Sequence, residues 1–194
     1  RAGVRRQSAR AGTALAVAAA IGTAGGTIEA QERTLRPFAA AVESGGSWSI
    51  DLPLSALAGD ATAIPLDSAS ASTTLSVPLD ASVDLESARL DLGVVNAAVL
   101  SDNSLMRILL NGKTVGQLPL RRDPARIRAS LDLDPADFRS GYNQLSFRVA
   151  QHYTGSCEDP DAPELWTEID ATRSSLALTW QRRPVEGSLA NLGQ

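Results

Sequence analysis

The segment ARLDLGV, residues 88–94, alternates apolar and polar side chains without a break. Alternation with a period of two is typical of a β-strand that buries one of its faces. The same pattern recurs around residues 48–54, 75–80, 127–133, 145–150 and 176–180. Because polar turns separate these segments, the sequence predicts an all-β chain folded as an antiparallel sandwich.

Turn signals support this prediction. Asn111-Gly112 stands between two apolar runs and predicts a hairpin, because both turn residues must adopt a positive φ. Asp134-Pro135 predicts a single helical turn, in which Asp134 is the N-cap. The segment SASASTT, residues 68–74, is of low complexity and is predicted to be a loop.

Prolines within or beside strand segments predict edge strands or bulges, because proline donates no backbone hydrogen bond. They are Pro53, Pro65 and Pro78.

The first thirty residues place four arginines before an apolar run, AGTALAVAAAI. This order predicts a signal peptide over residues 1–30 and hence export, and the alternative is an alanine-rich helix. The run is shorter than the ~20 residues that span a bilayer. Residues 31–47, which end in SGGS, are interpreted as a linker or turn. The sandwich is predicted over 48–183, and residues 184–194 would begin a linker to the next domain of a longer protein.

Composition narrows the classes of function. The formal net charge is −4, which argues against a nucleic-acid-binding protein. Cys157 and His152 are the only residues of their types, so cysteine and histidine alone cannot build a four-ligand zinc site. No cofactor is predicted. We expect His152 to be a hydrogen-bonded structural residue, and Cys157 to be buried or paired with a cysteine outside this sequence.

Two segments carry a resemblance to known proteins. LLNGKTVGQLPL (109–120), followed by FRSGYNQLSFRV (138–149), resembles jelly-roll β-sandwiches of the galactose-binding-like, carbohydrate-binding-module-like kind. HYTGSCEDPDAPELWTEI (152–169) is similar to a segment of the regulatory B subunits of bacterial cellulose synthase, in which His-Tyr-Thr leads to Cys-Glu-Asp-Pro and then to Leu-Trp. The resemblance covers roughly residues 85–180.

The resemblance implies a non-catalytic, periplasmic accessory subunit that acts with the catalytic subunit in cellulose biosynthesis. Such a subunit would guide the nascent β-1,4-glucan, and a C-terminal helix beyond this sequence would anchor it to the inner membrane. Self-association is a further expectation. The family is also labelled as binding cyclic-di-GMP, so a nucleotide-sensing regulatory module is a competing hypothesis.

Exposed aromatic rings flanked by polar groups are the side chains that pack on sugar faces. Trp166 and Tyr153, with Glu158 and Asp159, are the predicted carbohydrate contacts. The alternative for Trp166 is that it plugs one end of the sandwich. By their parity with neighbouring apolar residues, Trp48 and Trp180 are predicted to lie in the core.

Charged clusters define the remaining alternatives. The only basic cluster of the predicted folded part could pair with phosphates or line a solvated edge. It comprises Arg121, Arg122, Arg126 and Arg128. The acidic run over 158–170 would serve a hydrolase only if two carboxylates lay ~5 to 9 Å apart. Such oxygen atoms can also coordinate calcium, although no recognised calcium-loop spacing is present.

Overall fold

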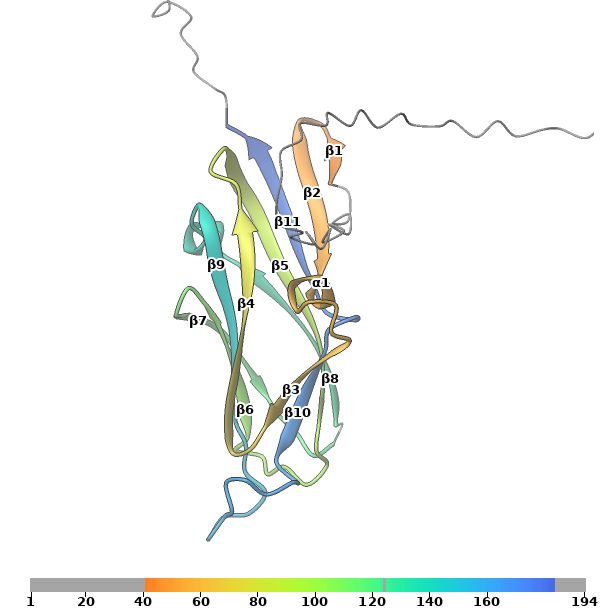
Figure 1. The fold of residues 1–194 in the computed structure, drawn as a ribbon, viewed down its shortest axis with the longest axis vertical. Coiled ribbons are helices and arrows are strands. Elements are labelled where there is room, and N and C mark those ends of the chain that lie inside the picture. The colour runs from red at the N-terminus through yellow and green to blue at the C-terminus, as the bar shows by residue number, and fades with distance from the viewer. Residues whose placement is uncertain (1–40, 124, 184–194) are drawn as a thin grey trace, which may run out of the picture. The chain divides into compact units, whose positions relative to one another are not determined.

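The computed structural model describes residues 41–123 and 125–183, and β-strands dominate them (Figure 1). The predicted signal peptide (1–30), most of the predicted linker and the C-terminal linker (184–194) lie outside the described residues. Among the described residues, no helix is long and apolar enough to cross a membrane.

The strands form two antiparallel sheets. Sheet A contains β1 (Val42–Ser44), β2 (Ser47–Pro53), β3 (Ala63–Asp67), β5 (Val83–Asn96), β8 (Arg126–Leu133), β10 (Trp166–Asp170) and β11 (Ser175–Arg182). Its order is β1-β2-β11-β5-β10-β3, and β8 pairs with β5. Sheet B contains β4 (Ser70–Leu79), β6 (Leu105–Leu110), β7 (Lys113–Pro119) and β9 (Gly141–Ala150), in the order β4-β9-β6-β7. The described helices are α1 (Leu54–Leu57) and the 3₁₀ turn η1 (Pro135–Asp137).

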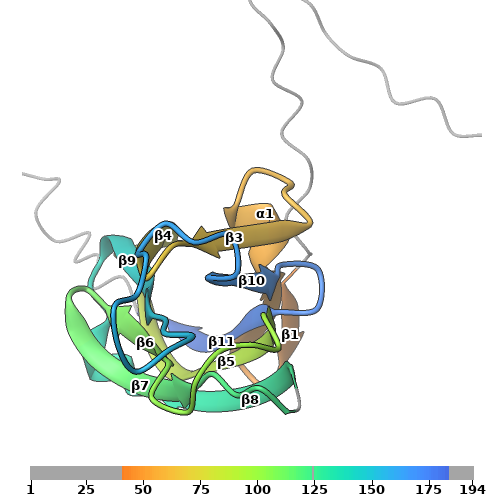
Figure 2. The same cartoon turned by 90° about the horizontal axis from the view of Figure 1, so that it is seen from below.

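The two sheets face each other around one apolar core, as the end-on view shows (Figure 2). Alternating residues of each strand point inward, which is the pattern that the sequence displays. The largest fully buried side chains from the strands include Phe147, Leu145, Leu90, Leu176, Ile169 and Met106. The predicted antiparallel jelly-roll sandwich is confirmed.

Strand pairing along one edge of β5 is interrupted at Gly93, and we call this interruption the break in sheet A. β11 pairs with β5 over Val83–Asp91, whereas β10 pairs with the same edge of β5 over Val94–Asn96. The chain between β10 and β11 bulges away, and the Ser174 hydroxyl closes the gap. Its oxygen accepts from the Gly93 N–H at 2.9 Å, and the hydroxyl donates to the Asp170 carbonyl at 2.7 Å. The break leaves Gly93 beside the turn that carries Arg173.

The predicted turns are confirmed. Asn111 and Gly112 join β6 to β7 with φ values of 51° and 86°. Asp134 caps η1 by accepting from the Ala136 N–H at 2.9 Å. Pro65 and Pro78 lie on β3 and β4, which are edge strands as predicted.

Three local predictions differ from the structure. The low-complexity segment 68–74 is not only a loop, since β4 begins at Ser70 and pairs with the whole of β9. The SGGS segment is a turn, which is one of its two expected alternatives, but it does not open the fold: Gly45 and Gly46, with φ values of 62° and 90°, join β2 to a preceding strand, β1. Trp48 and Trp180 are only partly buried near the end of sheet A, and of the two only Trp180 packs against the core cluster. The Arg182 guanidinium lies 5.2 Å from the centre of a Trp48 ring.

Candidate functional site

The loop over residues 151–165 joins β9 to β10 at the lower end of the sandwich in Figure 1. Glu158 braces this loop. One carboxylate oxygen lies 2.8 Å from Nδ1 of His152, and the other accepts from the Tyr153 N–H at 2.6 Å. These hydrogen bonds, that from His152 above all, lower the pKa of the Glu158 carboxyl. Both oxygens are therefore already engaged within the loop.

His152 has a structural place in the same loop. Its carbonyl accepts from the hydroxyls of Ser101 and Ser104 at 2.9 and 3.1 Å. Its own N–H donates to the Ser104 hydroxyl at 3.0 Å. These bonds tie the loop to the segment that precedes β6, which is the kind of role expected for this histidine.

Tyr153 and Asp159 also serve the loop. Tyr153 packs against the core, and its hydroxyl accepts from the Asp159 N–H at 3.3 Å. The Asp159 carboxylate accepts from the Asp161 N–H at 3.1 Å. The expectation that Cys157 is buried is wrong: it is exposed at the turn of the loop, with a φ of 44°. Its neighbours along the chain, residues 155–156 and 158–159, are small or polar, so this segment has no apolar side chain to bury next to the cysteine.

Trp166 faces outward from sheet A. It is the first residue of β10, where Thr167 and Ile169 are fully buried and point to the core. Because strand residues alternate between faces, Trp166 shares the outer face with Glu168 and Asp170. The Trp166 side chain is 37% exposed, and its backbone pairs with Asp67 of β3. This exposure argues against the alternative that Trp166 plugs the sandwich.

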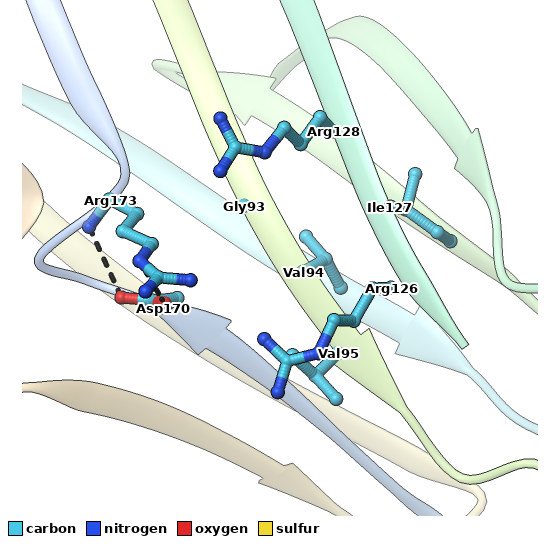
Figure 3. A pocket seen from close by; sticks show the side chains of 8 residues that line it. All are labelled: Gly93, Val94, Val95, Arg126, Ile127, Arg128, Asp170 and Arg173. Atoms are coloured by element: carbon cyan, nitrogen blue, oxygen red, sulfur yellow. Dashed lines mark hydrogen bonds and ion pairs between the residues drawn. The ribbon is translucent and has the colours of Figure 1, made fainter. Parts of the chain in front are cut away.

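A small pocket lies on the same outer face, over the break in sheet A (Figure 3). Arg126 and Arg128 reach it from β8, and their backbones pair with Val95 and Gly93 of β5. Arg173 reaches it from the turn between β10 and β11. In Figure 3 the guanidinium groups of Arg126 and Arg128 point across β5 toward this turn. We call this site the arginine pocket; its cavity volume is about 60 Å³.

Asp170 holds the turn that carries Arg173. Its carboxylate accepts from the Thr172 hydroxyl at 2.7 Å and from the Arg173 N–H at 3.1 Å. The Arg173 Nε lies 3.7 Å from the other carboxylate oxygen. The Thr172 hydrogen bond, followed by those from the Arg173 side, lowers the pKa of Asp170, so this carboxyl stays ionised.

A family model described as "Cellulose synthase BcsB, first CBM domain" matches residues 47–182, where CBM stands for carbohydrate-binding module. The chain belongs to this family. The match covers the strands from β2 to β11, including β8, β10 and the loop that Glu158 braces.

Two curated relatives carry the same printed name, "Cyclic di-GMP-binding protein". The protein of Xanthomonas axonopodis pv. citri (strain 306) is 40% identical over 97 residues, which are 49% of this chain and 12% of that protein. The protein of Pseudomonas fluorescens (strain SBW25) is 38% identical over 73 residues, 37% of this chain and 10% of that protein. The matched segments thus span about a tenth of these relatives.

Solved structures of low sequence identity are similar to parts of the chain. The CBM36-1 domain of a multidomain xylanase from the hindgut metagenome of Trinervitermes trinervoides is 13% identical, with a TM-score of 0.32, covering 59% of this chain and 74% of that domain. The EclA C-terminal domain, a sugar-binding protein, is 11% identical with a TM-score of 0.35, covering 59% and 76%.

The four arginines predicted as one cluster divide into two pairs. Arg126 and Arg128 line the arginine pocket, whereas Arg121 and Arg122 lie in the preceding loop and do not. That loop is held from the core side, because the buried Asn96 amide donates to the Arg121 carbonyl at 2.9 Å. The four arginines were grouped because they are close in the sequence, but the pairing of β8 with β5 brings only two of them to the pocket.

Sequence reasoning missed three residues of the arginine pocket. Asp170 is the last residue of β10, a strand of only five residues, and Arg173 lies in the short turn that follows it. Gly93 offered a signal, since it occupies a polar position in the middle of the alternating segment 88–94. A glycine there leaves a gap in the outer face of the sheet.

A second hollow lies near the other end of sheet A. It has a cavity volume of about 220 Å³ and a mainly apolar lining that includes Ile50, Pro78, Val83 and Trp180. Among the described residues, no three or more histidine, cysteine, aspartate or glutamate side chains gather in a group that could hold a metal ion.

Proposed function

We propose that this chain is the first carbohydrate-binding domain of a non-catalytic, periplasmic accessory subunit of bacterial cellulose synthase. In this proposal the subunit works beside the catalytic subunit and helps guide the β-1,4-glucan outward. Membership of the family supports the link to cellulose synthase. The predicted export signal supports the periplasmic location. We also propose that the subunit assembles with the catalytic subunit and with further copies of itself.

We further propose that glucan contacts the outer face of sheet A at Trp166. The observation that carries this step is the 37% exposure of Trp166 beside Glu168 on β10. An indole ring offers a flat apolar surface with a polar edge, which suits the C–H face of a sugar. Carboxylate and guanidinium groups of the same face would meet the sugar hydroxyls. Tyr153, Glu158 and Asp159 then support the loop that leads to Trp166.

A test of this proposal is calorimetric titration of the 194-residue chain with cellohexaose, in the native sequence and in Trp166→Ala. We expect saturable binding that Trp166→Ala weakens at least tenfold, a loss of about 1.4 kcal/mol. Trp48→Ala is the matched control, because this tryptophan lies at the other end of sheet A under Arg182. Unchanged affinity in Trp166→Ala, or loss of affinity in Trp48→Ala alone, would refute this placement of the glucan.

Nucleotide sensing is the second candidate function. It is supported by the printed name of the curated relatives and by the paired guanidinium groups of Arg126 and Arg128. Cyclic di-GMP is therefore the parallel ligand in the same titration. Binding of the dinucleotide without any binding of cellohexaose would favour this second function over the first.

A further inference from the structure

We propose that the arginine pocket is a binding site for a phosphate dianion. This site goes beyond the proposed contact with glucan and does not depend on it. The proposal follows from the charge of the pocket, from its size and from the way that the strands arrange its arginines.

The charge of the pocket is unbalanced. Arg126, Arg128 and Arg173 bring three positive charges, and among the lining residues only Asp170 is negative, which leaves an excess of two. Arg173 is paired with Asp170. Neither Arg126 nor Arg128 has an ion pair within the part of the chain that the structure describes. A doubly charged anion would neutralise the site, whereas a single carboxylate would leave one charge over.

The size of the pocket suits a small oxyanion. A water molecule needs roughly 10–15 Å³ of such volume, so a cavity of about 60 Å³ has room for a group of a few heavy atoms. Gly93 creates this room. A Cβ built at Gly93 would lie 3.7 Å from both Cβ atoms of Asp170 and Arg173, so any longer side chain would extend into the pocket.

Strand pairing and the turn between β10 and β11 place the three arginines around one hollow. Arg126 and Arg128 lie two residues apart on one strand, so both leave β8 on the same face. The Asp170 carboxylate and the Ser174 hydroxyl fix the turn that presents Arg173. Planar guanidinium forks bind phosphate oxygens in pairs, and their planarity reduces the entropy lost for each hydrogen bond that forms. Glu168 stands on the same face of β10, outside the pocket lining, opposite Val95.

Inorganic phosphate is the first probe, added to the ¹⁵N-labelled 194-residue chain at pH 7.5 and constant ionic strength. We expect saturable shifts of the Nε–H signals of Arg126, Arg128 and Arg173. Acetate, which carries one charge, should bind at least tenfold more weakly. Equal affinity for acetate, or shifts that grow linearly without saturation, would overturn the assignment.

Variants test whether phosphate binds in the arginine pocket or is attracted by positive charge anywhere on the surface. The double variant Arg126→Gln/Arg128→Gln should weaken phosphate binding at least tenfold, and Glu168→Gln should strengthen it. Arg107→Gln/Arg148→Gln is the matched control, because these two exposed arginines are paired neighbours on sheet B and their removal changes the net charge equally. Equal weakening by both double variants would overturn the proposal.

Filling the pocket without changing its charge is an independent test. Gly93→Val should abolish phosphate binding while the arginines remain, and Gly93→Ala, whose Cβ makes only ordinary contacts, should retain the fold. Undiminished binding in a folded Gly93→Val chain would overturn the site.

Glucose 6-phosphate, with glucose as its control, distinguishes the source of the phosphate group. Tighter binding than inorganic phosphate would indicate a phosphorylated saccharide, and equal binding would indicate the phosphate group alone. Failure of both phosphates to bind would overturn the proposal, and would leave the contact of glucan with Trp166 to be decided by its own titration.

Discussion

Glu158 lies in the acidic run, but its role is set by two neighbours along the chain. Its carboxylate joins the His152 ring to the Tyr153 N–H, and these bonds close the first turn of the loop before Trp166. A carboxylate that accepts such bonds is favoured in its ionised form. Glu158, which the sequence predicted as a carbohydrate contact, thus organises the backbone of the loop that leads to Trp166.

The lowered pKa of Glu158 predicts how stability depends on pH. Because the folded state lowers this pKa below the ordinary value of 4.5, the carboxylate contributes stability that is fully present above pH 4.5. That contribution is lost as the pH falls through the lowered pKa. We expect Glu158→Gln to reduce the melting temperature at pH 6 and to reduce the loss on acidification below pH 4.5. Thermal unfolding followed by circular dichroism from pH 3 to pH 7 measures both effects.

The control for this prediction is Glu164→Gln, which neutralises an exposed carboxylate of the same loop. Its melting profile should run parallel to that of the native chain. If Glu158→Gln and Glu164→Gln gave the same profile, the brace would not account for the pH dependence.

At the scale of elements, the β6–β7 hairpin is tied to the turn that precedes β9. The Asn111 amide donates to the Asn143 side chain at 2.8 Å and to the Asp137 carbonyl at 2.9 Å. Asn143 is fully buried and also binds both backbone groups of Arg139. The two turns therefore share one hydrogen-bond network, which fixes sheet B at this end.

Two substitutions at Asn111 separate its conformation from its hydrogen bonds. Alanine and glycine both remove the side-chain bonds, but only alanine is strained at a φ of 51°. We expect Asn111→Gly to lower the free energy of unfolding by about 2 kcal/mol. Asn111→Ala should cost roughly 1 kcal/mol more. Urea denaturation gives both values, and a smaller loss in Asn111→Ala than in Asn111→Gly would contradict the role of the positive φ.

At the scale of the whole molecule, both sheets contribute to a single apolar cluster. Residues as distant in the chain as Leu52 and Leu178 belong to it together with Phe147 of sheet B. Neither sheet can keep its inner face buried without the other. The outer face of sheet A is free to carry the arginine pocket and Trp166 because the inner face alone provides the packing.

This shared core predicts one cooperative transition for the described domain. Tryptophan fluorescence and far-ultraviolet circular dichroism should give the same urea midpoint, because Trp166 and Trp48 belong to strands of one sheet with one core. Two separated midpoints would show that the ends of the sandwich unfold independently. Gln117→Leu, an exposed change on β7, should leave the midpoint unchanged and serves as the control.

The sequence by itself determined the strands with long alternating patterns, their inward faces and the Asn111-Gly112 turn. These features depend on a side-chain period and on backbone preferences, which are local properties. It also determined the family, through the segment around His152 and Trp166. β3 and β10 were not predicted, because five residues are too few for a periodic signal. β4 was predicted too short, because a segment rich in serine and threonine resembles a loop.

Only the tertiary structure decided which outward side chains meet. Arg128 on β8, Gly93 on β5 and Arg173 beside β10 are brought together by strand pairing, and partner choice depends on how the whole core packs. The same pairing put Arg121 and Arg122 elsewhere. Local patterns determine on which face of a sheet a residue lies, whereas the register between distant strands determines which residues lie next to it.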